Sequence, residues 1–233
     1  MPDLLQVHDL HAWYGESHIL HGMEFEVGEG ELVTLIGRNG AGKTTTLRAI
    51  IGIIERRTGS VRFAGHELTQ LSSNRVARLG IAYCPEDRGI FASLNVEENL
   101  LLPPIVQRGG LGIDEIYSIF PNLAERRRSQ GTKLSGGEQQ MLAIARILRT
   151  GAKLLLLDEP TEGLAPAIVQ QIGAILKMLK SKGFTILLVE QNFRFAASLA
   201  DRHCIVEHGR VIDRIDNAYL KANIDKLHEY LGV

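Results

Sequence analysis

A short glycine-rich segment, GRNGAGKTT (Gly37–Thr45), has the residue types that bind a phosphate chain. It fits the pattern G-x-x-x-x-G-K-[ST], which ends in Lys43 and Thr44. In such a loop the glycines let backbone N–H groups turn inward around phosphates, and the helix that follows adds partial positive charge. We expect Lys43 to reach the β- and γ-phosphates of a nucleotide and Thr44 to bind Mg²⁺. The predicted nucleotide-binding residues here are Gly37, Arg38, Asn39, Gly40, Ala41, Gly42, Lys43, Thr44 and Thr45.

Two adjacent carboxylates end a second apolar run, LLLLDEP, whose leucines predict a strand buried on both faces. Asp158 is placed to bind Mg²⁺ directly or through water, and Glu159 could polarise an attacking water molecule. The alternative is a solvated turn that carries two acids by chance. Beside a phosphate loop, the catalytic interpretation is favoured. Together the two segments predict a nucleoside triphosphatase, but not which kind.

A second glycine pair opens a helix in LSGGEQQMLAIARIL (Leu134–Leu148). Ser135 could contact an anion through its hydroxyl, and Gly136 and Gly137 could do so through backbone N–H groups at the helix start. The simpler interpretation is an ordinary helix that Ser135 caps. The segment raises a question, because the chain already has a better phosphate loop.

The length of the chain suits one α/β domain, with or without a subdomain. The chain has 233 residues and a formal net charge of −1. A nearly neutral chain has no basic field that attracts nucleic acid, so we expect no nucleic-acid partner. No apolar run approaches the ~20 residues that span a bilayer, and the start lacks the features of a secretory signal. Cys84 and Cys204 each lie in an apolar run, which indicates buried, reduced thiols.

Strand and helix patterns alternate along most of the chain, which predicts a parallel sheet with right-handed crossovers. From about Asp87 to Thr150 the spacing is helical, with little strand signal. We therefore expect a core of residues 1–86 and 151–233 and a helical subdomain of residues 87–150. Strands are predicted at 4–10 and 23–27, as an antiparallel edge, and at 31–37, 61–64, 81–84, 153–158, 184–190 and 201–214. Helices are predicted at 43–51, 72–80, 96–103, 113–128, 136–150 and 166–183, and in the tail from Asp216.

Taken in order, these segments resemble the motifs of ATP-binding-cassette (ABC) ATPases over almost the whole chain. LSGGEQQ resembles the family signature, EGLAP resembles its D-loop, and Tyr14 matches the aromatic residue that stacks on adenine. The resemblance implies a P-loop α/β core with an antiparallel β edge and a helical subdomain. It also implies a head-to-tail dimer, in which Ser135 and Gly137 of one chain contact the ATP held by the other. ATP binding would close this dimer, and hydrolysis, with Mg²⁺ as cofactor, would reopen it.

Three segments narrow the resemblance to amino-acid importers: PEDRGIFASLNVEENL, TEGLAP and LLVEQN. They look most like one of the two ATPase subunits of the high-affinity branched-chain amino-acid system, with urea and short-amide importers as near relatives. The implied partners are integral membrane permease subunits, a second ABC ATPase and, indirectly, a periplasmic or extracellular solute-binding protein. The implied location is the cytoplasmic face of the inner membrane. An ATP clamp on ribosomes or DNA and a regulatory subunit with little turnover are the alternatives.

Two positions depart from the family pattern. Glu86 stands where most members have a glutamine near Mg²⁺, so its carboxylate could bind the ion or instead pair with Arg88. Gln191 stands where the wider family has a histidine that contacts the γ-phosphate. A glutamine can donate a hydrogen bond but cannot become cationic. Either Glu159 therefore carries most of the catalysis, or this site is the weaker of two unlike sites.

Two apolar features have alternative interpretations. Trp13 neighbours Tyr14 and faces the opposite side of a strand, so it is a rival platform for adenine, and Tyr14 could be simple edge packing. Ile90, Phe91 and Leu94 could form the apolar wall of a groove that receives a permease helix. They could equally anchor the helical insertion to the core.

Overall fold

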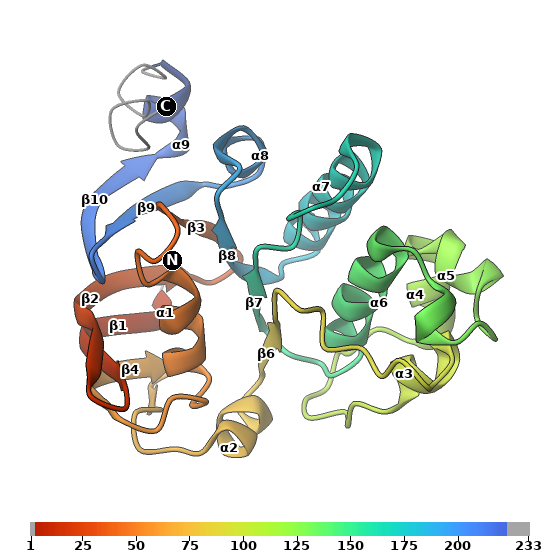
Figure 1. Ribbon diagram of the computed structural model, residues 1–233, viewed down its shortest axis with the longest axis horizontal. Helices are drawn as coiled ribbons and strands as arrows, with labels where there is room; N and C mark the ends of the chain where they lie inside the picture. The colour runs from red at the N-terminus through yellow and green to blue at the C-terminus, as the bar shows by residue number, and fades with distance from the viewer. Residues whose placement is uncertain (1–2, 223–233) are drawn as a thin grey trace.

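The apolar runs of the sequence form a six-stranded sheet in the middle of the molecule (Figure 1). The computed structural model describes residues 3–222. The strand order is β10-β9-β3-β8-β7-β6; β10 is antiparallel to β9 and the other pairings are parallel. Every residue of β3, β7 and β8 is buried, as expected for strands covered on both faces. The strands are β3 Leu32–Ile36, β6 Ile81–Cys84, β7 Leu154–Asp158, β8 Thr185–Glu190, β9 Arg202–Glu207 and β10 Arg210–Asp216.

The antiparallel strands form a sheet of their own, with the order β2-β1-β4-β5. They are β1 Asp3–Tyr14, β2 Ser17–Gly28, β4 Arg57–Phe63 and β5 His66–Glu67. β1 and β2 are longer than predicted, because the β1–β2 register shifts between Val7 and Leu10, and Asp9 between them has a φ of +46°. Such a bulge breaks the alternation of apolar residues from which a strand is predicted.

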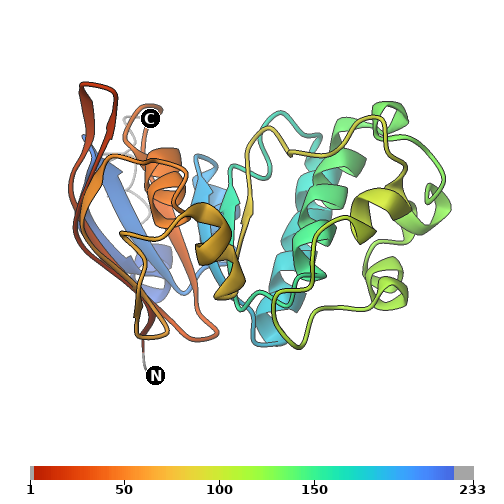
Figure 2. The same ribbon diagram turned by 90° about the horizontal axis from the view of Figure 1, so that it is seen from below.

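Helix α1 (Lys43–Ile50) lies between the two sheets (Figure 2). It contacts β1 and β2 on one side and β7 on the other. Leu47 and Ile50 are completely buried in a hydrophobic cluster that includes residues of both sheets. The loop before α1 is therefore held between two rigid layers.

Helices α3 to α7 lie on the other face of the parallel sheet (Figure 1). They are α3 Val96–Leu101, α4 Ile113–Ile119, α5 Pro121–Glu125, α6 Gly136–Leu148 and α7 Pro166–Ser181. The first four lie within residues 87–150, as predicted. These four helices share one hydrophobic cluster with α7 and the sheet. Within the described residues no separate core marks a boundary, so the division into a core and a helical subdomain of residues 87–150 stays a prediction.

One helix prediction needs correction. The helix predicted over 113–128 breaks at Phe120, because Pro121 lacks an N–H group and disfavours a helical conformation in the residue before it. Helix α2 (Ser73–Arg78) lies within the predicted range 72–80, and the Ser72 hydroxyl before it donates to the Asn74 side chain (2.6 Å). The short helices are 3₁₀ helix η1 Gly131–Lys133, α8 Phe193–Ala197 and α9 Asn217–Ala222; the predicted helical tail beyond 222 lies outside the described residues.

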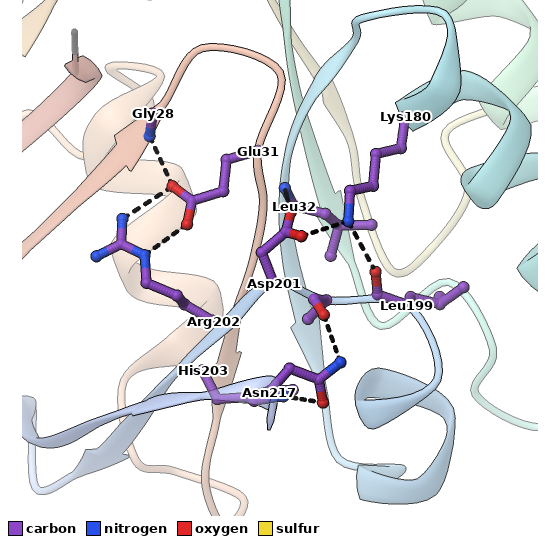
Figure 3. A network of polar contacts seen from close by, with 10 residues as sticks. Gly28, Glu31, Leu32, Lys180, Leu199, Asp201, Arg202, His203 and Asn217 are labelled. Carbon is purple, nitrogen blue, oxygen red and sulfur yellow. Dashed lines mark hydrogen bonds and ion pairs between the residues drawn. The ribbon is translucent and has the colours of Figure 1, made fainter. Parts of the chain in front are cut away.

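A network of polar side chains anchors the start of β3 (Figure 3). Asp201 accepts a hydrogen bond from the backbone N–H of Leu32 (3.0 Å) and pairs with Lys180 of α7 (2.6 Å). Arg202, the first residue of β9, forms an ion pair with Glu31 just before β3. These contacts fix β3, which leads into the glycine-rich loop, against β9 and α7.

Both cysteines are free thiols buried in apolar surroundings, as predicted. Burial raises the pKa of Cys84 and of Cys204 to about 12, so both thiols stay protonated and unreactive at neutral pH. Within residues 3–222, no helix combines the length and the apolar character needed to cross a membrane.

Candidate nucleotide site

The glycine-rich loop joins β3 to α1, and its shape depends on the absence of side chains. Gly40 and Gly42 have φ angles of +78° and +105°, which other residues rarely adopt. At Gly37 the reason is space, since a Cβ atom would lie 2.2 Å from the carbonyl oxygen of Val206. The loop can therefore bring backbone N–H groups and the N-terminus of α1 together around an anion.

Lys43 is the first residue of α1, and its ammonium group is buried in the loop. It donates to the carbonyl oxygens of Gly37 (2.9 Å) and Arg38 (3.2 Å), and Oε1 of Glu159 lies 3.5 Å away. A buried charge requires such partners. They hold the ammonium on the wall of the cleft described below, within reach of a phosphate bound by the loop.

Thr44 and Asp158 meet as the sequence predicts for a Mg²⁺ site. The Thr44 hydroxyl donates to Oδ1 of Asp158 over 2.9 Å. Two neighbouring ligands of an octahedral Mg²⁺ lie about 2.9 Å apart, because each is about 2.0–2.1 Å from the ion. The donors are oxygens, which this hard cation prefers, so the residues present fit Mg²⁺.

Tyr83 is a site residue that the sequence analysis missed. Its hydroxyl donates to Oδ2 of Asp158 (2.8 Å), so both oxygens of this completely buried carboxylate have partners. Burial raises the pKa of Asp158, and the two hydrogen bonds oppose that shift. The sequence gives little indication of this role, because Tyr83 reaches Asp158 only through the pairing of β6 with β7, which is known only from the fold.

Replacing Tyr83 with phenylalanine should therefore destabilise the nucleotide-free chain by about 1.5–3 kcal/mol, the usual loss for a hydrogen bond to a charged group. Urea unfolding gives the free energy of unfolding. Tyr117→Phe is the matched control, because the Tyr117 hydroxyl is buried and has no hydrogen-bond partner among residues 3–222, so its removal should cost nothing. Equal losses in the two variants would contradict the assigned Tyr83–Asp158 bond.

Glu159 lies between a cation and an amide. Lys43 faces its Oε1, and the side-chain amide of Gln191 donates to its Oε2. Its backbone N–H bonds to Val189 of β8 (3.0 Å), and its φ of +45° is unusual for a residue other than glycine. The surroundings over-determine this conformation, which is common for residues that do chemistry.

A cleft of about 410 Å³ opens above the loop, within the size range of small-molecule sites. Tyr14 lies on its wall and is 45% exposed. The Trp13 ring instead stacks on His18, with ring centroids 4.3 Å apart, beneath the guanidinium of Arg56. Tyr14 is therefore the ring available to a nucleotide base. The lining residues are Tyr14, Ile19, Asn39, Gly40, Gly42, Lys43, Thr44, Thr45, Glu86, Glu159, Glu162 and Gln191.

Two further carboxylates face this cleft. Glu86 is exposed on the wall and does not pair with Arg88, whose guanidinium donates to Gln139 (3.0 Å), so the alternative of a Glu86–Arg88 pair is wrong. Glu162 was missed from the sequence, although it follows Glu159 by three positions. Hydrogen bonding with Glu159, burial and the nearby charge of Glu86 raise the pKa of Glu162. A bound cation would relieve this repulsion.

The predicted signature residues lie outside the cleft of their own chain. Ser135 is exposed and caps α6 in a capping box: its Oγ accepts from the backbone N–H of Glu138, and Glu138 accepts from the N–H of Ser135. Gly137 is buried, and a Cβ atom there would lie 2.9 Å from Ile168 of α7. Within one chain, the fold thus brings together Tyr14 and the loop with the carboxylates, but not the signature.

Comparison with known proteins identifies the family. A family described as ABC transporter matches residues 20–162. The chain belongs to the ABC transporter family. This cassette is 43% identical over 232 residues to the "High-affinity branched-chain amino acid transport ATP-binding protein BraG" of Pseudomonas aeruginosa, covering 98% of this chain and 100% of the relative. It is 39% identical over 213 residues to the "Probable branched-chain amino acid transport ATP-binding protein LivF" of Archaeoglobus fulgidus, covering 89% and 90%.

Solved structures confirm the fold of this ABC cassette. An "ATP binding subunit of ABC transporter" superposes with a TM-score of 0.82 at 30% identity, covering 99% of this chain and 100% of that one. The resemblance from the motifs and the predicted fold class are therefore confirmed, and the chain is an ABC-type ATPase.

A second, larger cleft of about 760 Å³ lies beside β6. Its lining is mostly apolar and includes Ile53, Pro103, Pro104, Val106, Ala143 and Ile147. None of Ile90, Phe91 and Leu94 lines this cleft, so their predicted role as the wall of a permease groove stays a prediction. Ile90 packs on the helical cluster, and Asn99 holds the backbone of Phe91 with two hydrogen bonds (2.8 and 2.9 Å). Ile90 thus anchors this segment to the helical cluster, whereas the Phe91 side chain is 46% exposed.

Proposed function

We propose that this ABC cassette hydrolyses MgATP in the cleft above Gly37–Thr45 and thereby drives a membrane importer of branched-chain amino acids. The observation that best supports hydrolysis there is the convergence of Lys43, Glu159 and Gln191 on one cleft. The solute class is supported by the names of BraG and LivF, which cover nearly the whole chain.

Each residue of the cleft has a proposed role. Tyr14 stacks on adenine, and the loop binds the phosphates through its backbone N–H groups. Gly37, Arg38 and Ala41 do not line the cleft, but they shape the loop. Thr44 and Asp158 would hold Mg²⁺, with Glu86 on the wall as a further ligand. When bound, the ion neutralises phosphate charge.

The proton is handled by the chain itself. Glu159 orients the attacking water and accepts its proton, and Lys43 stabilises negative charge that develops on the phosphate. The Gln191 amide holds the carboxylate of Glu159 in place. In a head-to-tail dimer, Ser135 and the backbone of Gly137 from a second cassette complete the site.

The partners follow from the same proposal. The second cleft is the surface for a permease helix, and the chain is peripheral at the cytoplasmic face of the membrane through the permease. A solute-binding protein delivers the solute on the other side. No nucleic acid takes part, since the net charge is near zero.

The solute class can be tested with the cassette assembled with its permease and solute-binding protein in vesicles. Leucine, isoleucine or valine should stimulate ATP turnover, whereas urea should not. Glu159→Gln in the same assembly gives the background signal of the assay without catalysed ATP hydrolysis. Stimulation by urea alone would contradict the branched-chain assignment and leave the ATPase assignment intact.

A further inference from the structure

Glu190 is a buried carboxylate beside the nucleotide site with no role in the function described so far. It ends β8, is only 2% exposed, and pairs in register with Ile36, the last residue before the phosphate loop. It does not line the nucleotide cleft, in contrast to Gln191, the next residue. A buried carboxylate is costly unless it accepts hydrogen bonds, so its partners show what it holds.

Those partners lie on two different segments. The Thr161 hydroxyl donates to Oε1 of Glu190 over 2.7 Å, and the backbone N–H of Asn192 donates to Oε2 over 3.3 Å. Thr161 is buried and begins the turn that leads from β7 to α7, with its carbonyl bonded to the N–H of Leu164 (3.3 Å). Glu190 therefore ties the turn after β7 to the segment after β8.

Gln191 makes the complementary contact. Its amide donates to Glu159, two positions before Thr161. Glu190 and Gln191 are consecutive, and their side chains point to opposite sides of the chain. Glu190 contacts Thr161 and Gln191 contacts Glu159, both just after β7. The Glu190–Thr161 and Gln191–Glu159 contacts therefore link the same two segments, next to the backbone bond from Glu159 to Val189 (3.0 Å).

We propose that Glu190 is a positioning residue for ATP hydrolysis, which keeps the Gln191 amide against the Glu159 carboxylate through its bonds to Thr161 and Asn192. This inference rests on the proposed function, because it requires Glu159 to act on the attacking water. Residues 162 and 163, directly after Thr161, are exposed. A displacement of that exposed turn reaches Gln191 through the same bonds.

The environment of Glu190 agrees with this role. Its pKa is raised to about 7, mainly by burial and also by the charge of Glu159, although the hydrogen bonds from Thr161 and from the backbone of Asn192 oppose this shift. The carboxylate therefore depends on its donors to remain ionised near neutral pH, and loss of one donor weakens its hold on the others.

The test compares two substitutions of Thr161 in the cassette assembled with its permease. Thr161→Val keeps the shape and removes the hydroxyl; it should lower kcat for ATP hydrolysis about 10- to 100-fold and leave KM for ATP unchanged. Thr161→Ser keeps the hydroxyl and should restore most of the turnover. If Thr161→Val lowers kcat, raises KM for ATP and lowers the thermal stability together, the role of Thr161 is merely structural and the proposal is overturned.

A double variant tests whether the pair acts as a unit. Glu190→Gln keeps the size but presents an NH₂ group where one carboxylate oxygen accepts a bond, so it should also lower kcat. In Thr161→Val/Glu190→Gln the loss should equal that of the more impaired single variant, because both remove the same link. Multiplied losses, or parental turnover in Thr161→Val, would overturn the proposal. Failure of the parent itself to hydrolyse ATP would instead contradict the proposed function.

Discussion

Replacing Glu159 with glutamine is expected to lower ATP turnover about 10²- to 10⁴-fold while ATP still binds. The amide has the size of the carboxylate and can still accept a hydrogen bond from Gln191, so the cleft keeps its shape. It cannot take up the proton of the attacking water. Steady-state hydrolysis by the cassette assembled with its permease measures the loss, and equilibrium binding of ATP checks that the site is intact.

Glu162→Gln is the matched control for this variant. It removes the same charge from the same wall of the cleft, but from a carboxylate that does not lie between Lys43 and Gln191. Its loss of turnover should be much smaller. If the unmodified chain in the assembled transporter is no faster than Glu159→Gln, the cassette is a regulatory subunit that binds ATP without appreciable hydrolysis.

Two variants that are inactive alone should recover part of the ATP turnover when they are mixed. Lys43→Met removes the ammonium that faces the phosphates, and Ser135→Arg places a bulky cation at the exposed start of α6. In a head-to-tail dimer of one variant with the other, one cleft keeps Lys43 and is faced by an unmodified Ser135. That cleft should hydrolyse ATP. The turnover is measured after the two variants have exchanged subunits under native conditions in the assembled transporter.

The control for this mixture is Thr132→Arg, which adds the same charge to an exposed position just before α6 and leaves Ser135 unchanged. It should retain most of its turnover without mixing. A mixture of Lys43→Met and Ser135→Arg that stays inactive, while Thr132→Arg is active, would contradict a site shared between two chains. The dimer described above would then have to be abandoned.

The parts of the site that could be predicted are local in sequence. The segment Gly37–Thr45 specifies its own conformation, because glycines, a buried lysine and the first turn of α1 follow one another. Asp158 and Glu159 could be predicted because an apolar run places them at a strand end. Strand alternation also separates Tyr14 from Trp13, and the structure places only Tyr14 on the cleft.

The contacts that could not be predicted join strands that become neighbours only after folding. The order β3-β8-β7-β6 differs from the order along the chain, so nothing local indicates that Tyr83 reaches Asp158 or that Glu190 reaches Thr161. The antiparallel strands were predicted, but their full length was not, because a bulge in β1 breaks the alternation of apolar residues. The role of Phe91 could not be decided from the sequence, because an apolar residue in a loop does not reveal which side it packs on.

The contact of Gly137 with Ile168 has a mechanical consequence. Because Gly137 has no side chain, α6 and α7 come close together at their first turns. We therefore expect a displacement of the start of one helix to press directly on the start of the other. In the proposed dimer, a second cassette would then act on the exposed Ser135 and on the surface turn before α7 together.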